Sequence, residues 1–460
     1  MLPEPFDPTA ITTFRAVSCS YDDATATATF TYALDTSDAI VITCVETFTF
    51  PPPPVPLTAP RRAAFERLLA QLFLAAGLSY YKLAAPPTVR IEWGLWTIDE
   101  IAFHRRLLAK GLGEFSFVND LDPELSPAFE YRSVAVPREP VRGLELDRGP
   151  LVPVGGGKDS CVSIEALRAA GIAPTLVTVN RYPVIQDVID DAALPDLAVR
   201  RVLDPKLRDL NARGARNGHV PATAIVSLAA CACAVLHGHD AVVMSNERSA
   251  SEGNVSYRGV EINHQWSKSA EAELMLRSLV ADITPELAYF SLLRPLSELS
   301  IAQRFAATCE RYVDSFSSCN AAFRLDPARR VSRWCGQCPK CQFVYLALAT
   351  VLDRPTLQRI WGLELFESSP IHGFEALLGL SEWKPFECVG ETHECAVALW
   401  LVRSRDEWHG HAVLDALAAR LAVAGSSATE ADVDEVLRSS ADATLVVPKL
   451  YVHVLEDTHA

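Results

Sequence analysis

Polar and apolar residues alternate in the first part of the chain. Residues 12–50 contain stretches such as ATATATFTYAL and AIVITCVETFTF, in which roughly every second side chain is apolar. This period of two predicts an antiparallel sheet, which the proline run at 51–56 should end. Leucines and alanines at helical spacing predict a helix over 59–84. A strand over TVRIEW at 88–93 and a second helix around 98–111 should follow.

From residue 150 onward, short apolar runs alternate with helical stretches. The pattern predicts strands over LVPV at 151–154, APTLVTVN at 173–180 and DAVVMS at 240–245, and helices over 160–170, from 194 onward, and over 221–237. Alternating strands and helices are typical of a parallel sheet. Continuous apolar strands are expected where helices cover both of its faces.

Two further stretches complete the expected organisation. The segment from Asp120 to Gly149 is rich in Pro, Glu and Arg and has little periodicity, so we place a boundary there. Beyond about residue 352 the pattern is mainly helical, before a strand-like TLVVPKLYVHVL at 444–455. The sequence thus predicts three parts: an N-terminal α+β domain at 1–145, an α/β domain with a central parallel sheet at 146–352, and a mainly helical C-terminal region at 353–460.

The composition is that of a globular protein, with 49% hydrophobic and 22% charged residues in 460. No window approaches the roughly 20 uninterrupted apolar residues of a membrane span. The N-terminus, MLPEPFDPTA, lacks the basic start and apolar core of a secretory signal. We therefore expect a cytoplasmic protein with no membrane partner.

The net charge of -15 bears on the choice of partner. So acidic a surface opposes broad attraction to the phosphate backbone of nucleic acid. We therefore expect a small-molecule substrate and no nucleic-acid partner.

A glycine-rich loop carries the clearest chemical signal. It directly follows the strand at 151–154, directly precedes a helix, and consists of Gly155, Gly156, Gly157, Lys158, Asp159 and Ser160. Backbone N–H groups at such a helix start can hold an anion, and the helix dipole favours negative charge there. Lys158 adds a cation, and the Ser160 hydroxyl can bond a phosphate oxygen. Asp159 would repel phosphate unless a divalent cation intervened, so the loop predicts ATP together with magnesium at Asp159.

The loop does not match GxxxxGK[ST] or the dinucleotide pattern GxGxxG. It resembles the SGGxDS loop of the PP-loop ATP pyrophosphatase family, with Gly155 in place of the first serine. That resemblance implies the nucleotide-binding fold of this superfamily, of HUP type, for the central domain. It also implies cleavage of ATP between its α and β phosphates and transfer of AMP to a substrate oxygen.

Further motifs narrow the resemblance. These are VPVGGGKDSCVSIEAL, TVNRYP, NGHVPATAIVSL, SNERSASEGN at 245–254, NHQWSKS at 263–269, LLRPLSELS at 292–300 and WCGQCPKC at 334–341. Together they resemble the family of ATP-dependent epimerases that act on UDP-N-acetylmuramoyl-L-alanyl-L-glutamate in peptidoglycan synthesis. The resemblance implies an isomerase that adenylates the terminal L-glutamate, epimerises it to D-glutamate and releases AMP and pyrophosphate.

The residues that serve such a reaction fall into two groups. We place Asn180, Ser245 and Asn246 in the nucleotide site with the loop. A side-chain base must remove the Cα proton of the glutamate, and the candidates in the central domain are Asp187, His219, Glu247, His264 and Lys268. The sequence does not distinguish among these five.

A cysteine cluster lies near the end of the central domain. Cys335, Cys338 and Cys341 form C-x2-C-x2-C, and Cys319 precedes them by fifteen intervening residues. Four thiolates at this spacing suit a closed, tetrahedral zinc site that contributes to structure. An iron-sulfur cluster, free buried thiols and a catalytic pair are the alternatives.

Two rival functions follow from the same motifs. One is another PP-loop adenylating enzyme, such as a 7-cyano-7-deazaguanine synthase-like ligase, which also ends in clustered cysteines. Against it, this chain is about twice the length expected of such an enzyme. The other is a nucleotide-binding regulator, which would bind ATP but release neither pyrophosphate nor AMP.

Overall fold

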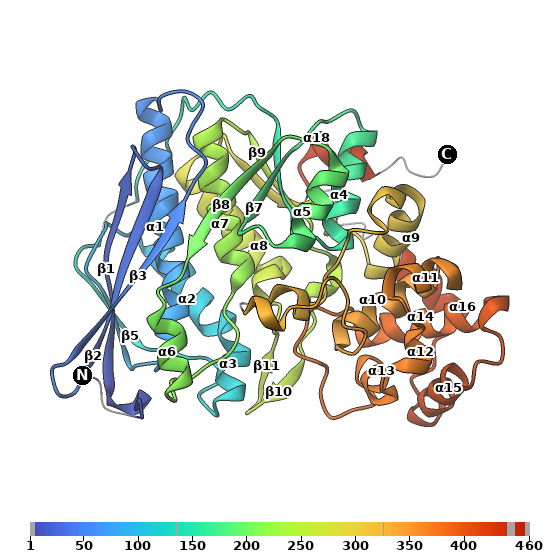
Figure 1. Cartoon of the computed structure of the whole chain (residues 1–460). Helices are drawn as coiled ribbons and strands as arrows, with labels where there is room; N and C mark the ends of the chain where they lie inside the picture. The colour runs from blue at the N-terminus through green and yellow to red at the C-terminus, as the bar shows by residue number, and fades with distance from the viewer. Residues whose placement is uncertain (1–4, 135–136, 325, 439–446, 456–460) are drawn as a thin grey trace.

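One ten-stranded sheet runs through most of the molecule (Figure 1). The computed structural model describes residues 5–134, 137–324, 326–438 and 447–455. The strands of the sheet, in spatial order, are β12 (Ala288–Ser291), β9 (Ala241–Met244), β6 (Pro150–Pro153), β7 (Thr175–Val179), β8 (Asp196–Val202), β3 (Val41–Thr49), β2 (Thr27–Thr36), β1 (Ile11–Asp22), β4 (Thr88–Ile91) and β5 (Ala128–Tyr131). A separate hairpin pairs β10 (Val255–Tyr257) with β11 (Val260–Ile262).

The N-terminal sheet and the central sheet are continuous. The predicted antiparallel sheet over 12–50 is confirmed by the antiparallel pairs β1–β2 and β2–β3. Strand β3 then pairs antiparallel with β8, so that Phe48 lies opposite Arg201. The boundary between 145 and 146 stays a prediction, because hydrogen bonds of a single sheet join the two parts.

The predicted helix from residue 194 onward is wrong. Residues Asp196–Val202 form strand β8, and helix α6 (Lys206–Ala212) begins only after it. Strand β8 is mostly half-buried or exposed, and Arg200 and Arg201 interrupt its apolar residues. It therefore lacks the continuous apolar pattern of the neighbouring strands, and the sequence pattern alone did not identify it.

The parallel strands separate two hydrophobic cores, since consecutive side chains point to opposite faces. Leu151 and Val242 belong to one core, whereas their neighbours Val152 and Val243 belong to the other. The first core also takes in α1 (Ala59–Tyr81), α2 (Ile98–Gly111), α3 (Gly113–Val118), α7 (Ala222–His237) and α8 (Ala270–Ile283). The second takes in α4 (Lys158–Ala169), α5 (Pro183–Ala192), α9 (Glu298–Thr308) and α10 (Pro339–Ala349). A mainly parallel sheet covered by helices on both faces is thus confirmed.

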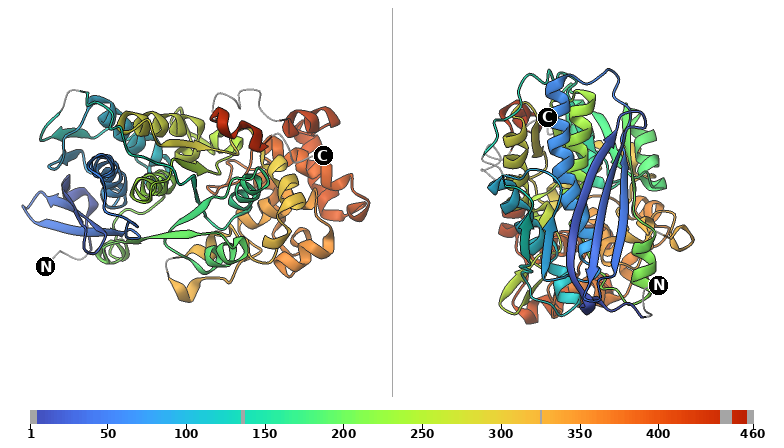
Figure 2. Two further views of the ribbon diagram at one scale, coloured as in Figure 1. Left: turned by 90° about the horizontal axis from the view of Figure 1, so that it is seen from above. Right: turned by 90° about the vertical axis from the view of Figure 1, so that its left-hand side faces the viewer.

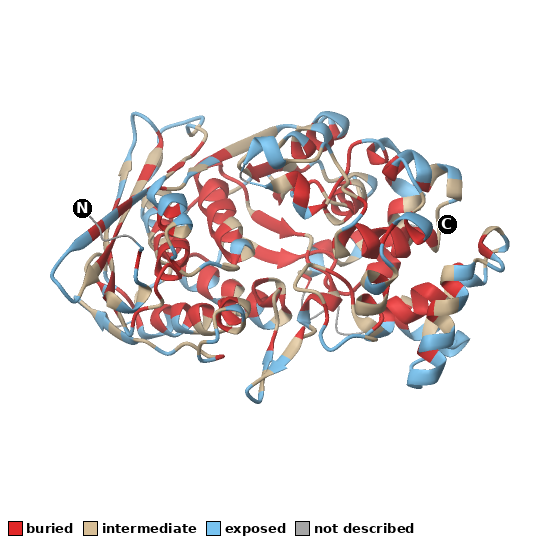
Figure 3. Ribbon diagram, turned by 60° about the horizontal axis from the view of Figure 1, so that its bottom comes forward, coloured by how far each residue is buried: buried red, intermediate tan, exposed pale blue. Residues whose placement is uncertain are grey.

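The C-terminal part consists of helices that extend the second core. They are α11 (Arg354–Trp361), α12 (Leu365–Ser368), α13 (Ile371–Leu377), α14 (Thr392–Arg403), α15 (Ala412–Ala424), α16 (Glu430–Leu437) and α18 (Lys449–Val452). Figure 2 shows α11 to α16 at the opposite end of the molecule from β1–β3, whereas α18 lies back over the central sheet, where Tyr451 packs against Phe290 of β12. Figure 3 shows that the central strands and the helix faces turned toward them are largely buried, whereas β1, β3 and β8 also carry half-buried and exposed residues.

The strand predicted over 444–455 is wrong where it can be compared. Residues 444–446 lie outside the described residues, but Lys449–Val452 form a helix that continues into a 3-10 turn at His453–Leu455. Tyr451 and Val454 are both buried, and their spacing of three residues places them on one face of a helix. In the described parts of the chain, no helix is both long and apolar enough to cross a membrane.

Candidate active site

The glycine-rich loop at 155–160, which was predicted to bind phosphate and is called the phosphate loop below, leads from β6 into the start of α4. Gly156 has φ of +82°, and its carbonyl accepts a 2.7 Å hydrogen bond from the Ser317 N–H. A Cβ atom at Gly156 would lie 3.3 Å from the carbonyl oxygen of Val184, whereas one at Gly155 would meet nothing within 4 Å. Helix α4 begins at Lys158 with no side-chain cap. Its first N–H groups are therefore suited to an anion at the carboxyl end of β6.

Three buried or partly buried carboxylates surround this loop. Asp159, Glu247 and Glu298 each place a carboxylate oxygen within 4.8 Å of the others. The Lys158 ammonium, which is 2% exposed, donates to Asp159 at 2.5 Å and also pairs with Glu298. Glu298 starts helix α9, and Glu247 follows strand β9. Oxygen ligands at this separation fit a divalent cation such as magnesium.

The carboxylates of this cluster repel one another, and neighbouring lysines oppose that repulsion. Burial raises the pKa of Glu298 above its usual value, with Asp159 and Glu247 adding repulsion and Lys158 opposing both. Burial also opposes ionisation of Asp159, but the neighbouring Lys158, Lys340 and Lys268 offset it and hold the Asp159 pKa below its usual value. The three lysines thus offset part of the repulsion among the three carboxylates, and a divalent ion bound here would offset it further.

The other residues predicted for the nucleotide site occupy different positions. The Ser245 hydroxyl donates to Ser163 of α4 at 2.8 Å, and the Asn246 amide donates to Ser291 at 3.0 Å, so both lie at the strand ends beside the loop. Asn180 ends β7 with φ of +62°, and its side-chain oxygen accepts from the Arg201 N–H at 2.8 Å. Asn180 thus joins the end of β7 to β8, and its part in nucleotide binding stays a prediction.

Two of the predicted proton-transfer residues lie together. The rings of His219 and His264 are 4.3 Å apart between centroids, and His264 pairs through Nδ1 with Glu114 of α3. Burial lowers the pKa of His219 well below its usual value, and the charge of His264 lowers it further. For His264 burial acts in the same direction, but hydrogen bonds with Cys388 and Glu114 outweigh it and raise the pKa to about 9.

A third predicted residue, Lys268, lies between this pair and the carboxylates. Burial disfavours its charge, but Cys388, Glu247 and Asp159 together raise the Lys268 pKa above the ordinary lysine value. Lys268 ends the 3-10 turn Trp266–Lys268. Its charge acts both on the carboxylates around the phosphate loop and on His219.

Asp187, the remaining predicted base, is not part of this site. It lies on α5 with an exposed side chain, and none of the metal-type clusters among the described residues includes it. The structure also brings in Glu114, Glu298 and Cys388, which the sequence reasoning missed. Glu298 lies within the quoted motif LLRPLSELS, so that motif contained a signal, whereas a lone cysteine in a helical region gave none.

The four predicted zinc ligands converge. The Sγ–Sγ distances are 3.9 Å for Cys319–Cys338, 3.7 Å for Cys335–Cys341 and 3.5 Å for Cys338–Cys341. Four thiolates at a Zn–S distance of about 2.3 Å in a tetrahedron have their sulfur atoms about 3.8 Å apart. The cluster therefore fits a tetrahedral metal site at the N-terminus of α10.

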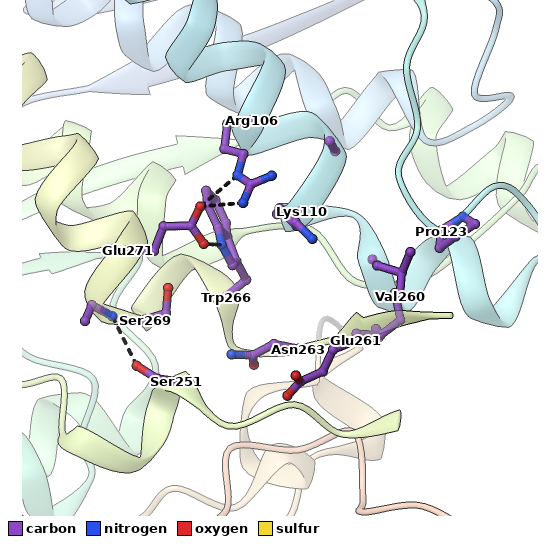
Figure 4. Close-up of a pocket in the computed structure, with 14 residues that line it drawn as sticks. Arg106, Lys110, Pro123, Ser251, Val260, Glu261, Asn263, Trp266, Ser269 and Glu271 are labelled. Atoms are coloured by element: carbon purple, nitrogen blue, oxygen red, sulfur yellow. Dashed lines mark hydrogen bonds and ion pairs between the residues drawn. The ribbon is translucent and has the colours of Figure 1, made fainter. Parts of the chain in front are cut away.

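A cavity of about 410 Å³ opens between α2 and the segment that contains β11 and Asn263. Figure 4 shows Arg106 and Lys110 of α2 on one side of it, and Glu261 and Asn263 at the β11 end on the other. Glu271 accepts a 2.7 Å hydrogen bond from Arg106 and a 2.8 Å hydrogen bond from the Trp266 indole. Asn263, which lines the cavity, immediately precedes His264 in the chain.

Comparison with known proteins places the chain in a family. Residues 5–292 match the MurL N-terminal domain and residues 315–432 match the MurL C-terminal domain. Three curated relatives, all named UDP-N-acetyl-alpha-D-muramoyl-L-alanyl-L-glutamate epimerase, are similar over most of their length.

The relative from Micromonospora sp. is 48% identical over 77% of this chain and 79% of its own. The relative from Xanthomonas oryzae pv. oryzae is 42% identical over 89% of this chain and 90% of its own. The relative from Salinispora tropica is 46% identical over 79% of each chain. With a family model matching more than half of its length, and relatives of this similarity, the chain belongs to the MurL family of epimerases.

Proposed function

We propose that this protein converts the terminal L-glutamate of UDP-N-acetylmuramoyl-L-alanyl-L-glutamate to D-glutamate in an ATP-dependent reaction that proceeds through an acyl adenylate. The relatives' printed names supply the substrate. The observation that carries the ATP-dependent step is the position of the Asp159, Glu247 and Glu298 carboxylates around Lys158 of the phosphate loop. We assign the loop to the PP-loop type on the same basis.

Adenylation removes the main obstacle to proton transfer. Removing the Cα proton while the neighbouring carboxylate is ionised would place a second negative charge on one enolate. In the first step a carboxylate oxygen attacks the α-phosphorus of ATP, and pyrophosphate leaves. The resulting mixed anhydride withdraws electrons from Cα, and each 1.36 kcal/mol removed from the barrier gives about tenfold in rate. After epimerisation, water hydrolyses the anhydride and releases AMP.

The chain's own groups divide this work. The N–H groups at the start of α4 and the Lys158 ammonium would bind phosphate oxygens. Asp159, Glu247 and Glu298 would hold magnesium, which neutralises phosphate charge when bound. Lys268 lies close enough to Asp159 and Glu247 to act on their charges, and both Lys268 and His264 contact Cys388, so the reacting glutamate would sit between the phosphate loop and the histidine pair.

We propose that the cavity beside Asn263 receives the nucleotide-sugar end of the substrate. The substrate is long, so the part beyond the dipeptide must leave the reaction site through open space. The cavity volume of about 410 Å³ lies within the usual range of ligand sites, roughly 300–1,000 Å³. Arg106 and Lys110 on its wall could bind the diphosphate.

We also propose that Cys319, Cys335, Cys338 and Cys341 bind zinc in a structural role. Four sulfur ligands complete a tetrahedral ion and leave no position for substrate. The site would hold the chain between Cys319 and α10, next to the phosphate loop.

The reaction is tested by incubating the protein with UDP-N-acetylmuramoyl-L-alanyl-L-glutamate, ATP and magnesium in deuterated water. We expect D-glutamate carrying deuterium at Cα, together with AMP and pyrophosphate. Oxygen-18 placed in the glutamate carboxylate should appear in AMP.

Asp159→Asn and Asp187→Asn provide a matched pair for this assay, since one carboxylate lies in the cluster and the other is exposed on α5. Asp159→Asn should lose activity and Asp187→Asn should keep it. Epimerisation without ATP, or AMP free of the isotope, would contradict the adenylation step.

A further inference from the structure

Cys388 is held in the site by a segment from the C-terminal part of the chain. The Lys384 N–H donates to the Asn254 carbonyl at 3.1 Å, and the Asn254 amide donates to the Pro385 carbonyl at 2.7 Å. The Gln265 amide donates to the Val389 carbonyl at 3.3 Å. These hydrogen bonds fix both sides of Cys388 against the segment that carries His264.

Further contacts fix the same segment from α10. The Lys340 ammonium donates to the Cys388 carbonyl, and the Lys340 N–H donates to the Glu387 carboxylate at 2.7 Å. Asn254 also accepts the His264 N–H at 2.8 Å, so one asparagine positions both the cysteine segment and the histidine. The relative placement of Cys388 and His264 is therefore built into the fold.

The thiol of Cys388 faces cationic side chains. It hydrogen-bonds with His264 and Lys268, and Lys340 lies close enough to act on it electrostatically. Burial disfavours the thiolate, but Lys268, His264 and Lys340 outweigh burial and lower the Cys388 pKa to about 6. By contrast, burial raises the pKa of Cys395, seven residues further along, where no cation offsets it fully.

We propose that the Cys388 thiolate is the base that removes the Cα proton of the adenylated glutamate from one face. This inference rests on the proposed function. Lys268 contacts Cys388 and also acts on the charges of Asp159 and Glu247. Cys388 therefore lies near the carboxylates of the phosphate loop as well as near His264. An acyl adenylate held at the loop would thus bring its Cα toward this thiol.

The other candidates are less suited to accept a proton. His264 and Lys268 are both protonated near neutral pH and act as hydrogen-bond donors to the thiolate. The His219 ring packs at an angle of 48° against the His264 ring, and Glu114 is paired with His264. Glu247 belongs to the carboxylates around the loop. Cys388 contacts both His264 and Lys268, and these cations lower its pKa to about 6, so it is suited to accept a proton.

The step balances within the site. The thiolate sulfur forms a bond to the Cα proton and becomes a thiol. The electron pair of the C–H bond moves onto the acyl carbonyl, giving an enolate whose oxygen carries the charge. In the reverse direction the thiol returns a proton to the same face of Cα.

The test compares Cys388→Ser and Cys388→Ala with the control Cys395→Ala in the full-length protein. Two rates are measured: exchange of labelled pyrophosphate into ATP that depends on the UDP-peptide, and entry of deuterium at Cα. Both Cys388 variants should lose deuterium entry by at least about 100-fold, while pyrophosphate exchange stays within about threefold. Cys395→Ala should keep both rates.

A second measurement reads the thiolate directly. The rate at which iodoacetamide alkylates Cys388, followed by peptide mass spectrometry, should rise with pH through a midpoint near 6 in the unaltered protein. The variant His264→Gln removes a cationic hydrogen-bond donor, so the midpoint should move upward. A midpoint near the ordinary thiol value in the unaltered protein would overturn the inference.

The outcomes separate the inference from the function on which it rests. Absence of UDP-peptide-dependent pyrophosphate exchange in the unaltered protein would refute the adenylation step. If that exchange is present and either Cys388 variant still admits deuterium at near the original rate, the assignment of Cys388 is wrong. Equal loss of both rates in folded Cys388 variants, as judged by circular dichroism, would also overturn it, because a dedicated base acts only after adenylation.

Discussion

Gly155 and Gly156 are neighbours in the phosphate loop but have different steric requirements. Gly156 adopts a positive φ and lies close to the backbone of Val184, whereas open space surrounds Gly155. Glycine is therefore required at Gly156 and optional at Gly155. The serine that the PP-loop pattern would place at 155 could be accommodated without steric conflict.

This difference gives a matched pair of variants. Gly156→Ala should destabilise the loop by about 1–2 kcal/mol, because a side chain at positive φ is strained, and should weaken ATP binding. Gly155→Ala should leave both nearly unchanged. Calorimetric titration with ATP and thermal unfolding measure the two effects, and equal behaviour of the two variants would contradict the loop geometry.

Predictability from sequence differs among the residues of the site. Lys158 and Asp159 were predicted because a contiguous motif contains them. Of the five predicted bases, His219, Glu247, His264 and Lys268 come together and Asp187 does not. Cys388 could not be predicted, because the lowering of its pKa depends on the charges of Lys268 and Lys340, which are distant in sequence.

Helix α10 connects the cysteine cluster to the reaction site. Cys338 and Cys341 lie at its first turn, and Lys340 between them contacts both Glu387 and Cys388. The Ser317 N–H, two residues before Cys319, holds the Gly156 carbonyl. An ion at the cluster would therefore influence the phosphate loop and the Cys388 segment without contacting substrate.

The variant Cys338→Ser tests this arrangement, with Cys309→Ser as the control because Cys309 is buried outside the cluster. Metal analysis should find one zinc per unaltered chain and less in Cys338→Ser. The midpoint of thermal unfolding should fall by roughly 5 °C or more for that variant. Stoichiometric iron with a visible absorption band would indicate an iron-sulfur cluster instead.

Helices and strands whose apolar residues recur at one regular spacing were predictable from the sequence. A strand that is only partly buried was not. The helix predicted around 98–111 is α2, which begins with a capping box between Thr97 and Glu100. The helix predicted over 221–237 and the strand over 240–245 are confirmed as α7 and β9. Strand β8 was missed because it is half-exposed and pairs with a parallel strand on one side and an antiparallel strand on the other. Its sequence therefore shows neither a continuous apolar run nor a regular alternation of polar and apolar residues.

Three distant parts of the chain meet around the proposed substrate path. Helix α2 supplies Arg106 and Lys110, the central part supplies the phosphate loop and His264, and the C-terminal part supplies Cys388. The sequence indicated the chemistry of the central part alone. How the parts come together depends on the shared sheet and on side-chain contacts such as those of Asn254, which no local pattern encodes.

The cavity proposal is tested with Arg106→Gln and Lys110→Gln, with Arg105→Gln as the control. Arg105 lies on the same helix but packs over the Phe129 ring away from the cavity lining. Loss of one charged contact, about 1.4 kcal/mol, should raise KM for the UDP-peptide about tenfold and leave KM for ATP unchanged. Steady-state kinetics decide, and an equal rise in both KM values would place the effect outside the cavity.

The pairing of β3 with β8 limits where the chain can be divided. A fragment starting near residue 146 would expose the outer edge of β8, with its backbone N–H and C=O groups unpaired, and would strip α1 from the apolar face of α7. Exposed strand edges beside uncovered apolar surface recruit other chains. We therefore expect a fragment that lacks the first 145 residues to associate with itself, which size-exclusion chromatography would show.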